Sequence, residues 1–67
     1  MPEAMLFNKR QGVVLDDIVR FWKADKVRQP CIFFVDTRGD SFHVIYAESV
    51  AGRETRDSEF SQLLERI

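Results

Sequence analysis

The chain has 67 residues, of which 45% are hydrophobic and 31% are charged, and its formal net charge is −1. These proportions are typical of one small globular domain, and the balanced charge gives no overall field that would attract nucleic acid or an anionic membrane. A single cysteine excludes a disulfide within the chain, and one cysteine with one histidine argues against a conventional metal site, so no cofactor is expected.

The chain begins with a short apolar segment. Residues 4 to 7, Ala-Met-Leu-Phe, are apolar and predict a short strand or a packed arm. The polar residues 8 to 12 follow, and Gly12 favours a turn there over the start of a helix. We therefore expect a single small domain that spans residues 1 to 67, in which residues 1 to 12 form a flexible or strand-like arm.

From Val13 onward the hydrophobic period becomes helical. On a helical wheel, six apolar residues fall within an arc of roughly 160°: Val14, Leu15, Ile18, Val19, Phe21 and Trp22. Asp16 and Arg20 lie on the other side and have the i, i+4 spacing of a favourable ion pair. Asp25 would fall inside the apolar arc, so the pattern predicts a helix from residue 13 to about residue 24.

Residues 30 to 47 predict a β-hairpin with its turn at Thr37-Arg38-Gly39-Asp40. A loop of two or four residues pairs Val35 with Phe42 and Phe33 with Val44. One face of the hairpin is then wholly apolar and consists of Cys31, Phe33, Val35, Phe42, Val44 and Tyr46. A three-residue loop would shift the register by one residue and scramble this pairing.

A final helix follows a polar segment. Residues 49 to 56 read as a loop around Gly52, and Asp57 or Ser58 is the expected N-cap. The helix then has an apolar stripe at i, i+3, i+4 and i+7, made by Phe60, Leu63, Leu64 and Ile67. The predicted fold class is α+β, in the order α-β-β-α, with a central antiparallel hairpin, an optional N-terminal strand, and two helices packed on one sheet face.

The predicted core follows from these elements. It consists of Val14, Leu15, Ile18, Phe33, Val35, Phe42, Val44, Phe60, Leu63 and Leu64. The second face of the hairpin has nothing in the chain to cover it, and its exposed members are Ile32, Phe34, His43 and Ile45. Because domains this small are often stabilised by association, we expect this surface to be a protein interface, most simply that of a homodimer. A different protein is the alternative partner.

A nucleic-acid contact is the second functional hypothesis. Four basic residues and one acid, Asp25, lie close together in the sequence, and the basic residues are Arg20, Lys23, Lys26 and Arg28. Such a patch would bind phosphates, with Trp22 or Phe34 stacking on bases. A solvated helix face explains the charges more simply, because Trp22 belongs to the apolar arc.

No pattern predicts an enzyme. His43 has a side chain suited to acid–base work near neutral pH, as in a small ribonuclease, but no motif places a second catalytic group beside it. Cys31 lies on the apolar face and is expected to be buried and inert. Arg38-Gly39-Asp40 spells a cell-adhesion tripeptide, which turn chemistry explains. We therefore expect a non-enzymatic binding or regulatory module without a small-molecule ligand.

Localisation is inferred from segments that the sequence lacks. No apolar run approaches the ~20 residues that cross a bilayer, and residues 1 to 7 lack the basic and apolar regions of a signal peptide. A lone cysteine fits a reducing compartment. The expected location is the cytoplasm, with no membrane partner.

Overall fold

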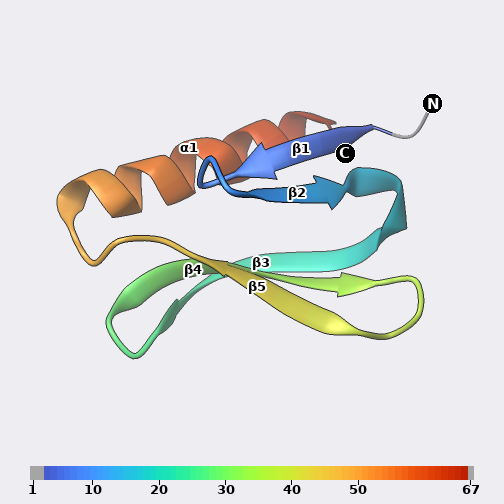
Figure 1. Ribbon diagram of the computed structural model, residues 1–67, viewed down its shortest axis with the longest axis horizontal. Helices are drawn as coiled ribbons and strands as arrows, with labels where there is room; N and C mark the ends of the chain where they lie inside the picture. Colours follow the sequence, from blue (N-terminus) through green and yellow to red (C-terminus); the bar gives the residue numbers. More distant parts are fainter. Residues whose placement is uncertain (1–2, 67) are drawn as a thin grey trace.

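A computed structural model describes residues 3 to 66, which form two antiparallel β-sheets and one long helix (Figure 1). The first sheet pairs β1 (Ala4–Phe7) with β2 (Gln11–Val14). The 3₁₀ turn η1 (Leu15–Asp17) leads to the second sheet, which has the order β3 (Ile18–Lys26), β4 (Gln29–Asp36), β5 (Ser41–Ile45). The helix α1 (Val50–Arg66) follows the last strand.

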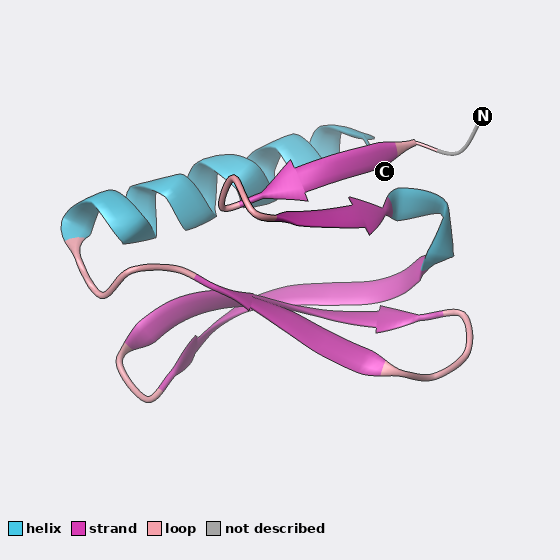
Figure 2. Ribbon diagram, viewed as in Figure 1, coloured by secondary structure: helices cyan, strands magenta, loops and turns pink. Residues whose placement is uncertain are grey.

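These elements form two layers. Figure 2 shows α1 and the β1–β2 hairpin together on one side, with the three-stranded sheet as the other layer. The core lies between the layers and is made by Met5, Phe7, Val13, Leu15, Ile32, Phe34, Val44, Tyr46 and Leu63. Phe7 of β1 and Phe34 of β4 meet there edge to face, with ring centroids 5.2 Å apart. Within residues 3 to 66, no other element covers the opposite face of the three-stranded sheet (Figure 1).

The predicted fold class was wrong in its number of helices. The predicted N-terminal strand is confirmed as β1, but residues 13 to 24 belong to β2, η1 and β3 instead of a helix. This segment is rich in β-branched residues, such as Val13, Val19 and Ile18, and in aromatic residues, both of which favour strands. Pairing with β4 satisfies the backbone of β3, an interaction that a helical wheel does not represent.

The final helix begins earlier than expected. It starts at Val50, so most of the segment predicted as a loop is helical, and the N-cap is Ser49, whose Oγ accepts a hydrogen bond from Gly52 N at 3.0 Å. Gly52 is buried, and a Cβ atom at this position would lie 2.0 Å from Ala47 O. Glycine therefore lets the start of α1 pass close to the preceding chain.

The β4–β5 hairpin and its turn are confirmed, but the predicted register was wrong by one residue. Phe34 pairs with Phe42 and Phe33 with His43. Asp36 N donates to Asp40 O at 2.9 Å, which leaves a three-residue loop in which Gly39 adopts a φ of 87°. The shift exchanges the two faces of β4, so that Ile32 and Phe34 lie in the core.

The predicted core is confirmed in part. Leu15, Val44 and Leu63 are buried. Five other members are half-buried: Ile18, Phe33, Val35, Phe42 and Phe60. The prediction was wrong for Val14 and Leu64, which are exposed. Ile67, the last member of the predicted helical stripe, lies outside the described residues.

A candidate binding face

The sheet face that turns away from α1 and the β1–β2 hairpin is the candidate site, and we call it the outer face. Side chains alternate between the two faces along each strand, and the register aligns them across the sheet. The outer face thus receives Arg20, Trp22, Ala24 and Lys26 from β3, Gln29, Cys31, Phe33 and Val35 from β4, and Ser41, His43 and Ile45 from β5. All three strands contribute an aromatic ring or an imidazole.

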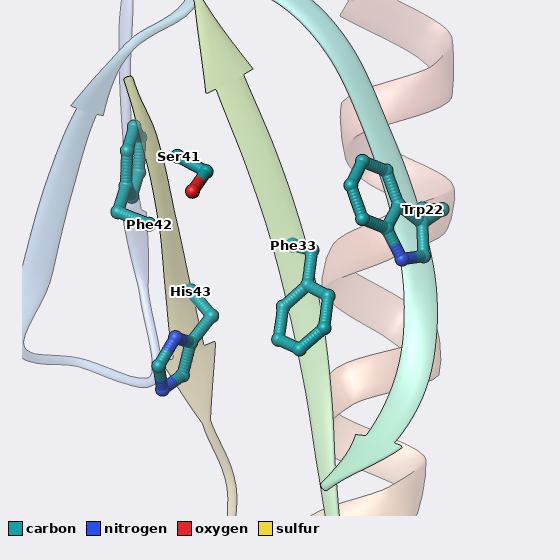
Figure 3. Close-up of a pocket in the computed structure, with 5 residues that line it drawn as sticks. All are labelled: Trp22, Phe33, Ser41, Phe42 and His43. Atoms are coloured by element: carbon teal, nitrogen blue, oxygen red, sulfur yellow. The ribbon is translucent and has the colours of Figure 1, made fainter.

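The rings of Trp22, Phe33 and His43 form a row across the three strands (Figure 3). Trp22 meets Phe33 with centroids 5.5 Å apart, and Phe33 meets His43 at 5.4 Å, both in edge-to-face geometry. Trp22 is 38% exposed, and the other two are half-buried. Together with Ser41 and Phe42 they line a hollow of about 260 Å³. The face therefore offers solvent a continuous aromatic surface.

Basic side chains accompany this row. The guanidinium carbon of Arg20 lies 5.7 Å from the centroid of the Trp22 ring, a cation–π distance. Lys26 ends β3 on the same face, and Arg28 lies in the turn that follows it. None of the strand residues on the outer face is acidic. Within residues 3 to 66, the ion pairs do not include Arg20, Lys26 or Arg28.

Asp25, the acid within β3, is engaged on the other side of the sheet, by α1. Asp25 Oδ1 accepts Arg53 Nη1 at 3.2 Å and lies 3.4 Å from Arg56 Nη1. Lys23 Nζ lies 3.5 Å from Asp57 Oδ1. The structure thus separates the four basic residues singled out in the sequence: Lys23 faces the helix, whereas Arg20 and Lys26 share the outer face and Arg28 lies at its end.

The predicted interface residues do not lie together. Ile32 and Phe34 are fully buried in the core of the chain, so they cannot form an exposed surface. His43 and Ile45 are half-buried, on the outer face. The uncovered face of the sheet is therefore not the predicted one, and its apolar side chains are those of Trp22, Phe33, Val35 and Ile45. A three-residue loop at residues 37 to 39 was the one signal that would have identified Phe33.

The two residues with potential for covalent or acid–base chemistry are held in apolar settings. Cys31 is fully buried, as predicted, and its thiol donates to Ala24 O at 3.4 Å. Burial, together with the Asp25 carboxylate, raises the pKa of this thiol, which disfavours the reactive thiolate. The imidazole of His43 packs on Phe33. Among the described residues, no group of three His, Cys, Asp or Glu side chains is placed to hold a metal ion.

The Arg38-Gly39-Asp40 tripeptide is held by the turn that contains it. One oxygen of the Asp36 carboxylate accepts hydrogen bonds from Arg38 N at 2.9 Å and Asp40 N at 3.0 Å, and the other lies 3.2 Å from Arg38 Nη2. These bonds explain the polar residues around Gly39 as parts of a hairpin loop.

Comparison with protein-family models, with curated proteins and with solved structures found no match to the chain. Within residues 3 to 66, the structure has no helix with the length and apolar character needed to span a bilayer.

Proposed function

We propose that the chain is a non-enzymatic binding module that holds a single-stranded nucleic acid on its outer face. The observation that carries the proposal is the row of Trp22, Phe33 and His43 on an uncovered sheet face, with Arg20 and Lys26 beside it. Aromatic rings and basic side chains are the two components of a surface on which unpaired nucleobases stack.

The two kinds of side chain have separate roles in this proposal. Each nucleobase that stacks on an aromatic ring contributes about 1–3 kcal/mol to the binding free energy, whichever of the bases it is. Arg20 and Lys26 bind phosphates, and the release of counterions makes that part of the affinity depend on salt. A duplex is a poorer ligand, because its bases are already stacked on one another.

The charge of the outer face also bears on the competing hypothesis of a homodimer. Two copies that meet face to face would bring the positive charges of Arg20 and Lys26 on both copies together. The face has no acidic strand residue to pair with them, so these charges would repel one another. A dimer at the free edge of β3 avoids this repulsion. It is the second candidate, because Val19 of this edge strand is 60% exposed.

Binding can be measured with the protein's own fluorophore, since Trp22 is the only tryptophan. A labelled 12-nucleotide single strand, as DNA and as RNA, is titrated at low and at moderate salt while anisotropy and Trp22 emission are recorded. We expect quenching of Trp22 and an affinity that falls with salt. Trp22→Ala should weaken binding about ten-fold or more by anisotropy, as the loss of one stacking contact predicts.

Charge variants test the phosphate contacts. Arg20→Glu should weaken binding and flatten the salt dependence, whereas Lys9→Glu, the same change of charge in the loop between β1 and β2, should leave both nearly unchanged. Absence of binding to either single strand at low salt would refute the proposal. Light scattering of the same samples decides the second candidate, which requires a dimer at micromolar concentration.

A further inference from the structure

The β3–β4 hairpin has an unusual residue at its tip. Lys26 pairs with Gln29, so Val27 and Arg28 form a two-residue loop. Val27 adopts a φ of 62° and is 93% exposed. Tight hairpin loops require a positive φ, but they normally use Gly, Asn or Asp there, because a β-branched side chain is strained in this conformation.

Among the other residues with a positive φ, Asn8 and Gly39 are of the types that this rule predicts, whereas Lys9, with a φ of 58°, is not, but its side chain is unbranched at Cβ. Asn8 has a φ of 52° in the loop between β1 and β2, and Gly39 has a φ of 87° in the loop between β4 and β5. At Val27 the chain instead has a strained valine whose side chain projects into solvent. Because the side chain is exposed, it makes no packing contact in the core that would offset the backbone strain.

The position of the tip connects it to the outer face. Figure 1 shows this turn at the end of the three-stranded sheet away from the β4–β5 turn. Lys26 belongs to the outer face, two positions along the strand from Ala24 and four from Trp22. Val27 is therefore an exposed apolar group between two basic residues, Lys26 and Arg28, at the end of the sheet that β3 reaches four residues beyond the aromatic row.

We infer that Val27 is a contact residue for the nucleic acid: its side chain packs against a base or sugar at one end of the bound strand, while Lys26 and Arg28 bind the adjacent phosphates. The inference rests on the proposed function and extends its site to the hairpin tip. A basic and apolar tip also suits an anionic membrane, but one valine buries little in a bilayer, whereas the aromatic row continues the site along the sheet.

Two substitutions separate the strain from the contact. Val27→Gly and Val27→Asn both suit a positive φ, and the asparagine keeps the loop ordered while making the side chain polar. Val50→Asn is the matched control, since Val50 is 74% exposed at the start of α1. Each variant is unfolded in urea and titrated with the single strand used for wild type and Trp22→Ala.

Both Val27 variants should have a higher urea midpoint than wild type and yet bind about five-fold more weakly, the effect of losing part of one apolar contact. Val50→Asn should bind as wild type. If Trp22→Ala loses affinity and both Val27 variants bind as wild type, the inference is wrong and the proposed function stands. If Val27→Asn binds normally and only the glycine variant is weakened, loop order is responsible and the contact is refuted.

Two further outcomes would also overturn the inference. A wild-type protein that binds no single strand refutes the proposed function and the inference with it. Vesicles of phosphatidylserine and phosphatidylcholine provide the other arm: binding to vesicles that depends on Val27, without binding to the oligonucleotide, would assign the tip to a membrane.

Discussion

Phe33 and Phe34 are neighbours in β4, and their side chains point to opposite sides of the sheet. Phe34 is fully buried and stacks on Phe42, with ring centroids 5.1 Å apart. Phe33 is half-buried on the outer face, between Trp22 and His43. This alternation divides the hairpin into a face that supports the fold and a face that is available for binding.

Truncation of the two rings should therefore have unequal effects on stability. Phe34→Ala opens a cavity between the layers and should lower the free energy of unfolding by about 3–5 kcal/mol, enough to unfold a domain of this size. Phe33→Ala removes a ring that is already partly hydrated and should cost about 1 kcal/mol. Urea titrations followed by circular dichroism measure both. Equal costs, or a larger cost at Phe33, would contradict the observed register.

The sequence predicted this hairpin but not which of its faces is buried. Thr37-Arg38-Gly39-Asp40 is compatible with loops of two, three or four residues, and the alternation of side chains makes a shift of one residue exchange the faces. Which loop length the chain adopts depends on Asp36, whose carboxylate accepts hydrogen bonds from the backbone amides of Arg38 and Asp40. Turns commonly recruit Asp for such hydrogen bonds, but the sequence does not say which of the three loop lengths the bonds of Asp36 select.

The segment from Val13 to Ala24 illustrates a different limit. Its apolar residues fit a helical arc, and what makes it extended is pairing in two hairpins, with β1 for Val13 and with β4 for Trp22. The partners lie outside the segment, so the periodicity of the segment alone does not include them. The C-terminal helix was predicted because its apolar stripe can be seen within the helix's own sequence. Its start was missed because Gly52 was taken as part of a loop, whereas the close approach of the Ala47 backbone explains a glycine inside the helix.

Gly52 gives a second stability prediction. In an exposed helix interior, replacement of Gly by Ala gains about 1 kcal/mol. At Gly52 the new methyl group would collide with the backbone of Ala47, so we expect Gly52→Ala to lower stability by about 1–3 kcal/mol. Gly12→Ala is the control, because no atom lies within 4 Å of a Cβ built there. Thermal unfolding should show a lower midpoint for Gly52→Ala alone; a higher one would mean that α1 starts elsewhere.

Tyr46 and Glu59 connect β5's end to the helix, and they predict how stability responds to alkali. The Tyr46 hydroxyl donates to Glu59 Oε1, which also accepts Asn8 N at 2.8 Å. Burial, and then the hydrogen bond and charge of Glu59, raise the pKa of Tyr46 far above its ordinary value of about 10. A raised pKa in the folded state stabilises the fold below pH ~10, and this contribution is lost as the pH rises further.

The comparison of wild type with Tyr46→Phe isolates this effect. At neutral pH the phenylalanine variant should be less stable by about 1 kcal/mol, the net value of one hydrogen bond. Between pH 9 and pH 11.5, roughly the range around the ordinary tyrosine pKa, wild type should lose more stability than the variant. Because Tyr46 is the only tyrosine, its absorbance at alkaline pH reports the same ionisation directly. Ionisation near pH 10 in the folded protein would refute the buried hydrogen bond.

The Asp36 carboxyl lets us predict how stability responds to acid. Desolvation raises the pKa of the Asp36 carboxyl, but the hydrogen bonds from Asp40 N and Arg38 N, together with the Arg38 guanidinium, outweigh it, and the net shift is downward. A lowered pKa in the folded state stabilises the fold above the ordinary value of about 3.9, and this contribution disappears as the pH falls below it.

Asp36→Asn should remove that dependence. The variant should be less stable than wild type at pH 6, and the difference should narrow as the pH approaches 2, because wild type then loses its carboxylate as well. Urea midpoints across this range measure the difference, and a constant gap would argue against the charged turn. Since the turn selects the register that exposes Phe33 and buries Phe34, the same variant should also bind the single strand more weakly at neutral pH, although Asp36 lies outside the outer face.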